Sequence, residues 1–327
     1  MKELQVKDKA VLKELDLNSE IPLTQLAKKT KISKDQAKYR IDNLIKTWVI
    51  KKFVTQIDPT KLGYSVYKLF FKFENLTETK EKELIEWLMK NEFVYWIAQC
   101  RGRWDMNIAI FAENVQHFNN IFSAFFNKFG KFISEQDFNI TLKVGAMNKK
   151  WLYEEKGISR EVKVWGENPE KIILDNIDIK ILRIIANNSR ESYVNIASKL
   201  KTTTRKVIYR IKELEKKKII LGYSISVDYE ILKKQFFKSA MYFNNLNDKT
   251  KKRIEEYCKN RPSINYFIFC LGRWPLEIEF IVKDNKEFFD EMESFKKNFP
   301  EMKSYDLMMF SKEYKFDWMP MCYKVEK

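Results

Sequence analysis

The stretch Ser33–Trp48, SKDQAKYRIDNLIKTW, decides the fold of this chain. Four of its apolar residues recur at helical spacing and are expected to share the inner face of one helix: Ala37, Ile41, Leu44 and Trp48. Ser33 is a good N-cap in front of them. A second short helical pattern, Leu23–Thr30, lies just before it and is separated from Ser33 by only two residues. Two helices joined by so tight a turn indicate a helix-turn-helix.

The same pattern returns 170 positions later in Thr202–Lys218, TTTRKVIYRIKELEKKK. Shifting the sequence by 170 also aligns residues far outside this stretch. The matching pairs include Asp8 with Asp178, Ala27 with Ala197, Cys100 with Cys270, Gly102 with Gly272 and Trp104 with Trp274. A two-fold repeat of this size indicates a duplicated unit rather than a solenoid.

A β-prone segment follows each helix-turn-helix: Val49–Ile57 in the first unit and Ile219–Val227 in the second. A β-ribbon after a recognition helix is the wing of a winged helix, and Gly222 is expected to provide its turn. Each unit then alternates strand and helix signals in the order β-α-β-β-α-β, which predicts a ferredoxin-like split βαβ sheet domain. In the first unit the segments are Tyr64–Phe73, Thr77–Lys90, Phe93–Cys100, Trp104–Ala112, Asn114–Phe129 and Phe132–Val144.

The predicted fold class is therefore α+β, with two tandem units that each carry a winged helix-turn-helix and a ferredoxin-like βαββαβ sheet domain. The expected domains are residues 1–63, 64–147, a connector at 148–170, 171–235 and 236–327. Helices cover only one face of such a sheet. The strand Tyr64–Phe73 is apolar on both faces, so the sheets of the two units are expected to pack on each other within the chain.

The net charge of +16 is concentrated in the two helix-turn-helix segments. Residues 1–63 hold 14 basic and 8 acidic side chains, a net +6, and residues 171–235 hold 15 and 7, a net +8. The first sheet domain, residues 64–147, is balanced at 10 and 10. Such localisation is the electrostatic footprint of a surface that binds a polyanion, which favours double-stranded DNA as the partner.

Several classes of function are disfavoured. The longest apolar runs are about ten residues, too short to cross a membrane, and the first residues lack the apolar stretch of a signal peptide. The four cysteines form no close pair and no metal-like spacing, so no metal and no cofactor is expected, and core thiols in a cytoplasmic protein are the favoured interpretation. The single histidine, His117, lies in a Phe-rich helical pattern and is not expected to be a catalyst.

Candidate DNA-contacting residues are the polar positions of the two recognition helices and of the first β-prone segment. They are Ser33, Lys34, Gln36, Lys38, Tyr39, Lys51, Lys52, Thr203, Thr204, Arg205, Lys206, Tyr209 and Lys212. A helix of 100° per residue turns Asp35, Tyr39, Asp42 and Lys46 outward in the first unit. It turns Arg205, Tyr209, Lys212 and Lys216 outward in the second, so the second helix is expected to attract phosphates more strongly. Arg40 and Arg210 lie nearer the buried side, where each could hold a phosphate or tie helices together.

A winged helix followed by a βαββαβ domain resembles the Lrp/AsnC, or feast/famine, transcription regulators. The repeated Tyr-Arg-Ile pattern and the segment CRGRWD at 100–105 carry the resemblance, the latter being similar to the family's Gly-x-x-Asp turn. It implies a DNA-binding regulator that associates through its sheet domains. It also implies a small effector, often an amino acid, near Gly102 and Asp105. The second turn has Pro275 in place of the acid, which weakens the expectation of ammonium binding there.

Two alternatives remain open. Siroheme decarboxylases resemble the same two-part fold, and the resemblance would imply an enzyme with His and Arg around the sheet-domain cavity, but this chain has no histidine besides His117. An architectural protein that binds DNA with little sequence preference is the other alternative. Gly102 is also explained as a turn glycine, and Asp105 as a carboxylate that starts a strand.

Overall fold

The computed structural model describes residues 4–153, 162–167 and 170–323. The first unit comprises α1 (Val6–Leu17), α2 (Leu23–Thr30), α3 (Lys34–Lys46), β1 (Ile50–Ile57), the 3₁₀ turn η1 (Pro59–Leu62), β2 (Ser65–Phe73), α4 (Glu78–Lys90), β3 (Val94–Gly102), β4 (Met106–Ala112), α5 (Val115–Phe129), η2 (Gly130–Phe132) and β5 (Ile133–Met147). Two short elements follow, α6 (Lys150–Tyr153) and β6 (Val162–Trp165).

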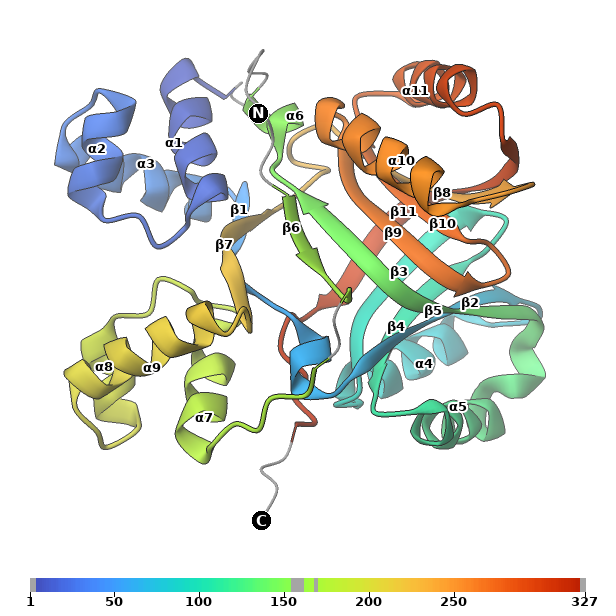
Figure 1. Ribbon diagram of the computed structural model, residues 1–327, viewed down its shortest axis with the longest axis horizontal. Helices are drawn as coiled ribbons and strands as arrows, with labels where there is room; N and C mark the ends of the chain where they lie inside the picture. The colour runs from blue at the N-terminus through green and yellow to red at the C-terminus, as the bar shows by residue number, and fades with distance from the viewer. Residues whose placement is uncertain (1–3, 154–161, 168–169, 324–327) are drawn as a thin grey trace.

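The second unit repeats this order from the first helix to the last strand. It comprises α7 (Asn176–Ile185), α8 (Tyr193–Lys199), α9 (Thr204–Lys216), β7 (Ile220–Val227), β8 (Gln235–Phe243), α10 (Asp248–Asn260), β9 (Ile264–Gly272), β10 (Leu276–Val282), α11 (Asn285–Asn298) and β11 (Met302–Phe316). Both helix-turn-helix units lie at one end of the molecule, at the left of Figure 1, and the long strands with their four helices form the other end. The tandem α+β fold predicted from the sequence is confirmed.

Eight long strands form a closed sheet. Their order is β2, β4, β3, β11, β8, β10, β9 and β5, and β5 returns to pair with β2, while β6 adds to the free part of β5. The last strand of each unit makes this closure. Residues 133–141 of β5 pair with β2 and residues 139–146 pair with β9 of the other unit. In the same way β11 pairs first with β8 and then with β3.

The apolar residues on both strand faces are explained by this closure. Helices α4 and α5 cover the outer face of the first unit's strands, and α10 and α11 cover the second (Figure 1). The inner faces meet around a small core whose members are Phe70, Cys100, Trp104, Ala240, Trp274 and Met308. The sheets of the two units therefore pair within the chain, by shared edges as well as by facing side chains.

The two helix-turn-helix units are related by a local two-fold axis. In the ribbon, Val54 of β1 pairs with Ser224 of β7, its own counterpart at a shift of 170. Ser19 and Ser189, also counterparts, lie with their Oγ atoms 2.6 Å apart in the interior. A residue can meet its own counterpart only near the axis that relates the units. One continuous hydrophobic core joins both helix-turn-helix units.

The wing differs from the hairpin expected in each unit. Strands β1 and β7 are single strands that pair antiparallel with each other, so each unit contributes half of one shared ribbon. Gly222 is not a turn residue, because it lies within β7 opposite Gln56. The hydrophobic pattern of a strand predicts that it needs a partner but not which strand supplies it.

Trp48 was expected on the inner face of the recognition helix, and this is wrong. The helix ends at Lys46, and Trp48 follows in the left-handed region at φ 60°, with 65% of its surface exposed. Three of the four residues predicted for that face, Ala37, Ile41 and Leu44, are buried. None of the helices in the described residues is long and apolar enough to cross a membrane.

Candidate nucleic-acid interface

Each recognition helix is set by the turn that precedes it. The first helix of the pair, α2, ends at Thr30, and its C-cap Lys31, whose φ of 52° lies in the left-handed region, reverses the chain before α3 begins at Lys34. Lys201 has the same conformation, at φ 50°, before α9. Buried Val207, Ile211 and Leu214 then anchor α9 against its unit, as Ala37, Ile41 and Leu44 anchor α3. The opposite faces of both helices are thereby left for solvent or a partner.

The N-terminal turns of both helices use several predicted contact residues as caps. Ser33 Oγ accepts a hydrogen bond from the Gln36 N–H, and the Gln36 side chain accepts one from the Ser33 N–H. Thr203 caps α9 in the same way by accepting from the Lys206 N–H. These three side chains therefore stabilise the helix ends. Thr204, the first residue of α9, is half-buried.

The predicted outward residues are exposed. Tyr39 and Tyr209 expose 70% and 60% of their surface, which is high for aromatic side chains. Five basic residues on the same helices are also exposed: Lys34, Lys38, Arg205, Lys206 and Lys212. Within the described part of the chain, the side chains of these five make no ion pair or hydrogen bond. Their charges are therefore free to act on a polyanion.

The two recognition helices carry different charges. On α3 the exposed residues include Asp35 and Asp42, whereas the matching positions on α9 hold Arg205 and Lys212. One of the two acids on α9, Glu215, accepts a hydrogen bond of 2.6 Å from the Tyr223 hydroxyl of the ribbon. Electrostatic attraction to phosphates is therefore stronger at α9.

Arg40 and Arg210 hold helices together. Arg40 Nη1 lies 2.6 Å from Asp8 Oδ1 on α1. Arg210 Nη1 lies 2.8 Å from Asp175 and 3.3 Å from Asp178, at the start of α7. Of the two roles left open by the sequence, the structure therefore shows the tie between the first and third helix of each unit.

One of the two ribbon lysines contacts residues away from the recognition helices. Lys51 and Lys52 are exposed on β1, but Lys52 Nζ lies 3.1 Å from Asn187 Oδ1 and 3.9 Å from Asp317 Oδ1. Asp317 follows β11, so Lys52 contacts the sheet end of the molecule. A DNA contact by Lys51 or Lys52 stays a prediction of the sequence alone.

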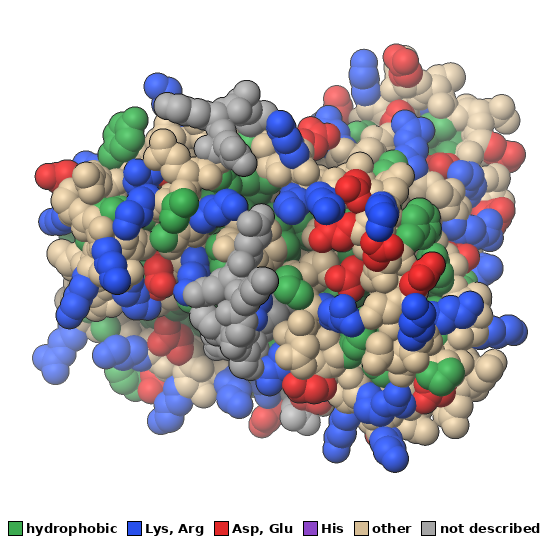
Figure 2. Space-filling view, turned by 90° about the horizontal axis from the view of Figure 1, so that it is seen from above, with side chains coloured by type: hydrophobic (Ala, Val, Ile, Leu, Met, Phe, Trp, Pro, Cys, Tyr) green, Lys and Arg blue, Asp and Glu red, His purple; other side chains and the backbone are tan. Residues whose placement is uncertain are grey.

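Basic side chains outnumber acidic ones at the helix-turn-helix end. Figure 2 shows this at the left, whereas red and blue side chains are interspersed over the sheet end at the right. This matches the net charges of +6 and +8 in the two segments, from 14 basic and 8 acidic and from 15 basic and 7 acidic residues. The exposed charge and the two-fold arrangement together make this end the candidate nucleic-acid interface.

The predicted effector residues lie close together in the loop between β3 and β4. Gly102 has φ 114°, and a Cβ there would stand 2.4 Å from the Leu307 carbonyl oxygen, so only glycine fits. Both oxygens of Asp105 are already bonded, one to Lys72 Nζ at 2.8 Å and one to the Phe73 N–H at 2.9 Å. This geometry explains both residues structurally, and their binding of an effector stays a prediction.

Sequence reasoning missed a cluster of buried charges inside the closed sheet. Lys68 and its counterpart Lys238 are 4% and 0% exposed, and both contact Glu277. A signal was present, because the same lysine interrupts the apolar strands Ser65–Phe73 and Gln235–Phe243 at the same position of the repeat. The described residues contain no group of His, Cys, Asp and Glu that could hold a metal ion.

Comparison with known proteins adds to this geometry. The AsnC-type helix-turn-helix domain matches residues 174–215, and the winged helix-turn-helix DNA-binding domain matches residues 4–50. The HTH-type transcriptional regulator FL11 of Pyrococcus horikoshii is 32% identical over 113 residues, which cover 35% of this chain and 74% of that regulator. The HTH-type transcriptional regulator LrpA of the same organism is 30% identical over 128 residues, which cover 38% and 85%.

Among solved structures, the siroheme decarboxylase NirDL is similar over nearly the whole chain. The alignment covers 95% of this chain and 92% of that one, with a TM-score of 0.62 and 12% identity. At this identity the likeness shows the fold alone. The sequence relatives match single units, whereas this structure matches both units together.

Proposed function

The chain belongs to the Lrp/AsnC family of helix-turn-helix transcription regulators, and we propose that its two recognition helices bind the two unlike halves of one DNA site. It is a DNA-binding regulator, as its family implies. The unlike half-sites are the proposal. A duplicated chain can change one helix without changing the other, which a symmetric homodimer cannot do.

The observation that carries this proposal is the local two-fold axis through the shared ribbon. A palindromic DNA site is bound by two helix-turn-helix units, here called heads, that are related by a two-fold axis. The pairing of Val54 with Ser224 gives the two units that relation. The common core fixes the two heads as one body. The single chain thus holds a complete pair of heads.

The chemistry of the two outer faces indicates which half-site each head prefers. Arg205 at the start of α9 can make a bidentate contact to guanine. Asp35 and Asp42 on α3 repel phosphates, but a carboxylate can accept from the amino group of cytosine. We therefore expect an imperfect palindrome, with tighter binding by the second head.

Replacing Arg205 with alanine should weaken binding to the preferred DNA site by about 1–3 kcal/mol if Arg205 reads a guanine. Lys212→Ala should instead reduce the slope of log affinity against log salt by about one, because one phosphate contact is lost. Fluorescence anisotropy with a labelled duplex, selected from a random pool and titrated over a salt series, measures both effects.

The matched control is the first-unit pair Lys34→Ala/Lys46→Ala, compared with Arg205→Ala/Lys212→Ala. All four residues are exposed, so neither pair should unfold the protein. An equal loss of affinity from the two pairs would contradict the asymmetry. A competitor-DNA titration distinguishes selective binding from the architectural alternative. An architectural protein would be displaced from the labelled duplex by an excess of any other duplex.

We propose that the chain is not an enzyme, and the position of its only histidine supports this. His117 lies on α5, where its Nδ1 accepts from the Glu113 N–H at 3.4 Å and its ring lies edge-on to Phe93. It is not among the residues that line the cavity beneath the ribbon. That cavity measures about 100 Å³, whereas sites for large organic ligands range from about 300 to 1,000 Å³. A tetrapyrrole does not fit without rearrangement.

A further inference from the structure

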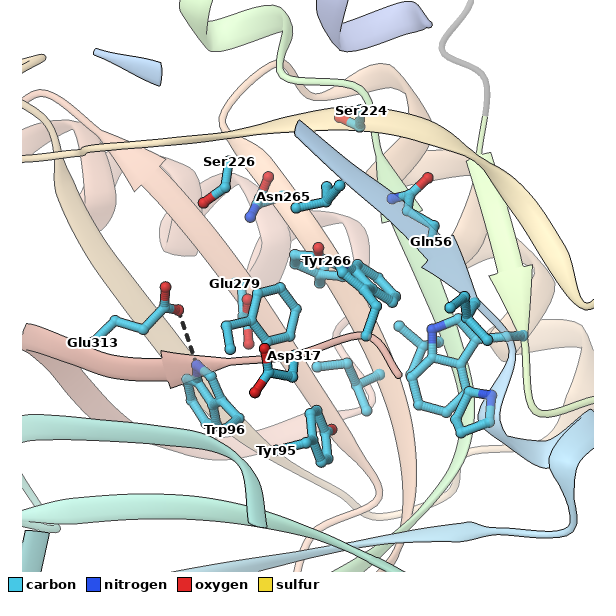
Figure 3. A pocket seen from close by; sticks show the side chains of 18 of the residues that line it. Gln56, Tyr95, Trp96, Ser224, Ser226, Asn265, Tyr266, Glu279, Glu313 and Asp317 are labelled. Atoms are coloured by element: carbon cyan, nitrogen blue, oxygen red, sulfur yellow. Dashed lines mark hydrogen bonds between the residues drawn. The ribbon is translucent and has the colours of Figure 1, made fainter. Parts of the chain in front are cut away.

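One end of the closed sheet lies directly beneath the ribbon that joins the two DNA-binding heads. The cavity there, about 100 Å³, is roofed by residues of β1 and β7 and floored by strands of both units. Figure 3 shows Gln56, Ser224 and Ser226 above it and Tyr266, Glu279 and Glu313 around it. Any molecule in this cavity would touch the heads and the sheets at once.

The cavity lies on the local two-fold axis, but its two sides have diverged. Lys68 and Lys238 are counterparts, and both line it. The acids come only from the second unit. Glu279 pairs with Lys238 across β10 and β8, and the matching partner of Lys68 is Ala109. Glu313 of β11 pairs with Ala98 of β3. At the matching place where β5 pairs with β9, Val144 lies opposite Ile268, the counterpart of Ala98. The duplication has thus placed carboxylates on one side only.

Each lysine that lines the cavity already has a carboxylate. Lys68 Nζ lies 2.7 Å from Glu277. Lys238 Nζ lies 3.2 Å from both Glu277 and Glu279. Lys149 Nζ lies 2.9 Å from the buried Asp16. These cations are satisfied, so they do not call for an anionic ligand.

Glu313 differs from Glu279 and Asp317, the other acids that line the cavity, in having no ion pair among the described residues. Its carboxylate accepts a hydrogen bond of 2.9 Å from Trp96 Nε1 and makes no ion pair with the described residues. Burial raises the pKa of this carboxyl and nearby Glu279 adds to the rise, whereas the Trp96 hydrogen bond and the more distant charges of Lys51 and Lys52 oppose it. Asp317, by contrast, accepts from Asn187 at 2.9 Å and lies near Lys52. A partly buried carboxylate without an ion pair favours a ligand of positive charge.

Aromatic rings form much of the cavity wall. They include Tyr95, Trp96, Tyr266, Phe236, Phe316 and Trp318. Ring faces attract cations, and Lys238 Nζ already lies 4.5 Å from the centre of the Trp96 ring. We propose that this cavity binds a small protonated amine, whose ammonium pairs with Glu313 and whose apolar part lies against the aromatic rings.

The size and position of the cavity define the ligand further. A volume of about 100 Å³ suits a molecule of about five or six non-hydrogen atoms. Because β1 and β7 roof the cavity, the occupant would contact the ribbon that sets the two heads relative to each other. Control of DNA affinity by the amine rests on the proposed function, whereas binding of the amine does not.

The test is calorimetric titration of the full chain, without DNA, at pH 7. Isoamylamine is the probe, because it is protonated at that pH and has six non-hydrogen atoms. Isoamyl alcohol and isovalerate, the neutral and anionic analogues, are the controls. We expect the amine to bind with a Kd of about 1 mM or tighter and the two analogues to bind at least about tenfold more weakly.

Glu313→Gln should weaken amine binding by about tenfold or more and leave the alcohol unaffected. The glutamine oxygen can still accept from Trp96, and a thermal melt checks the fold. The matched variant Asp317→Asn removes a carboxylate that already has partners and should cost less than about threefold. Equal binding of amine and alcohol by the wild-type chain, unchanged amine affinity in Glu313→Gln, or an equal loss in Asp317→Asn would each overturn the proposal.

A second titration, with the labelled duplex present, tests the link to DNA. We expect saturating isoamylamine to shift the DNA affinity of the wild-type chain by about threefold or more, and to have no such effect on Glu313→Gln. Amine binding with unchanged DNA affinity would overturn the coupling and leave the site standing. Failure to bind any DNA would count against the proposed function instead, since the first titration contains none.

Discussion

Replacing Glu277 with glutamine should lower the free energy of unfolding by about 3–5 kcal/mol, the usual cost of removing one partner from a buried ion pair. Glu277 is fully buried inside the closed sheet, 2.7 Å from Lys68 Nζ and 3.2 Å from Lys238 Nζ. Burial alone would raise the pKa of Glu277, but the two ammonium groups outweigh it and hold the pKa at about 2. In the variant, Lys238 would keep Glu279, and Lys68 would lose its ion-pair partner among the described residues.

Urea unfolding followed by circular dichroism measures this loss, and a double variant identifies its cause. Lys68 has no other carboxylate within ion-pair distance among the described residues, whereas Lys238 keeps Glu279 and the Asn107 side-chain oxygen at 3.2 Å. Lys68→Met/Glu277→Gln removes one charge of each sign and should recover much of the stability. If the double variant is less stable than Glu277→Gln alone, the loss does not arise from an uncompensated charge.

The repeat was the strongest signal in the sequence, because it made each pattern visible twice. The recognition helices, the order of strands and the location of positive charge all followed from local periodicity and composition. The outward face of α3 was predicted from the buried position of Ala37 alone, and the exposure of Tyr39 confirms it. Such features depend on residues close in sequence, which is why a single amino-acid sequence suffices to predict them.

The strand pairings that join the two units could not be predicted in the same way. Pairing of β1 with β7, and of β5 with β9, joins residues more than 100 positions apart, and strand periodicity does not identify a partner. The position of Trp48 depended on where α3 ends, which is the least certain property of a predicted helix. The cavity depends on both kinds of feature, because its walls come from all eight strands of the closed sheet and from the ribbon.

A second charged site lies between the two DNA-binding heads and makes their stability depend on pH. Glu20, after α1, is half-buried and accepts a hydrogen bond of 3.4 Å from the Tyr193 hydroxyl of the other head. The charged groups that face it are Arg190, its own counterpart in the repeat, and Glu215, which is bonded to Tyr223. Burial, and next the Glu215 carboxylate, raise the pKa of Glu20 from 4.5 to about 7.

The direction of the pH effect follows from that rise. Below about pH 4.5 Glu20 is protonated in both the folded and the unfolded chain, and its full contribution to stability is present. Between about pH 4.5 and 7 the unfolded chain ionises while the folded chain stays protonated, so stability falls as pH increases. A shift of this size corresponds to about 3 kcal/mol, lost by the time the pH has passed the folded pKa.

Glu20→Gln should therefore be more stable than the wild-type chain by about 3 kcal/mol at pH 8 and equal to it at pH 4. The glutamine keeps an acceptor for the Tyr193 hydroxyl but cannot ionise beside Glu215. Urea unfolding of both proteins across this pH range measures the difference. Glu74→Gln, at an exposed glutamate outside the heads, is the control and should change the curve little. A Glu20→Gln advantage that is constant with pH, or largest in acid, would show that Glu20 does not carry the raised pKa.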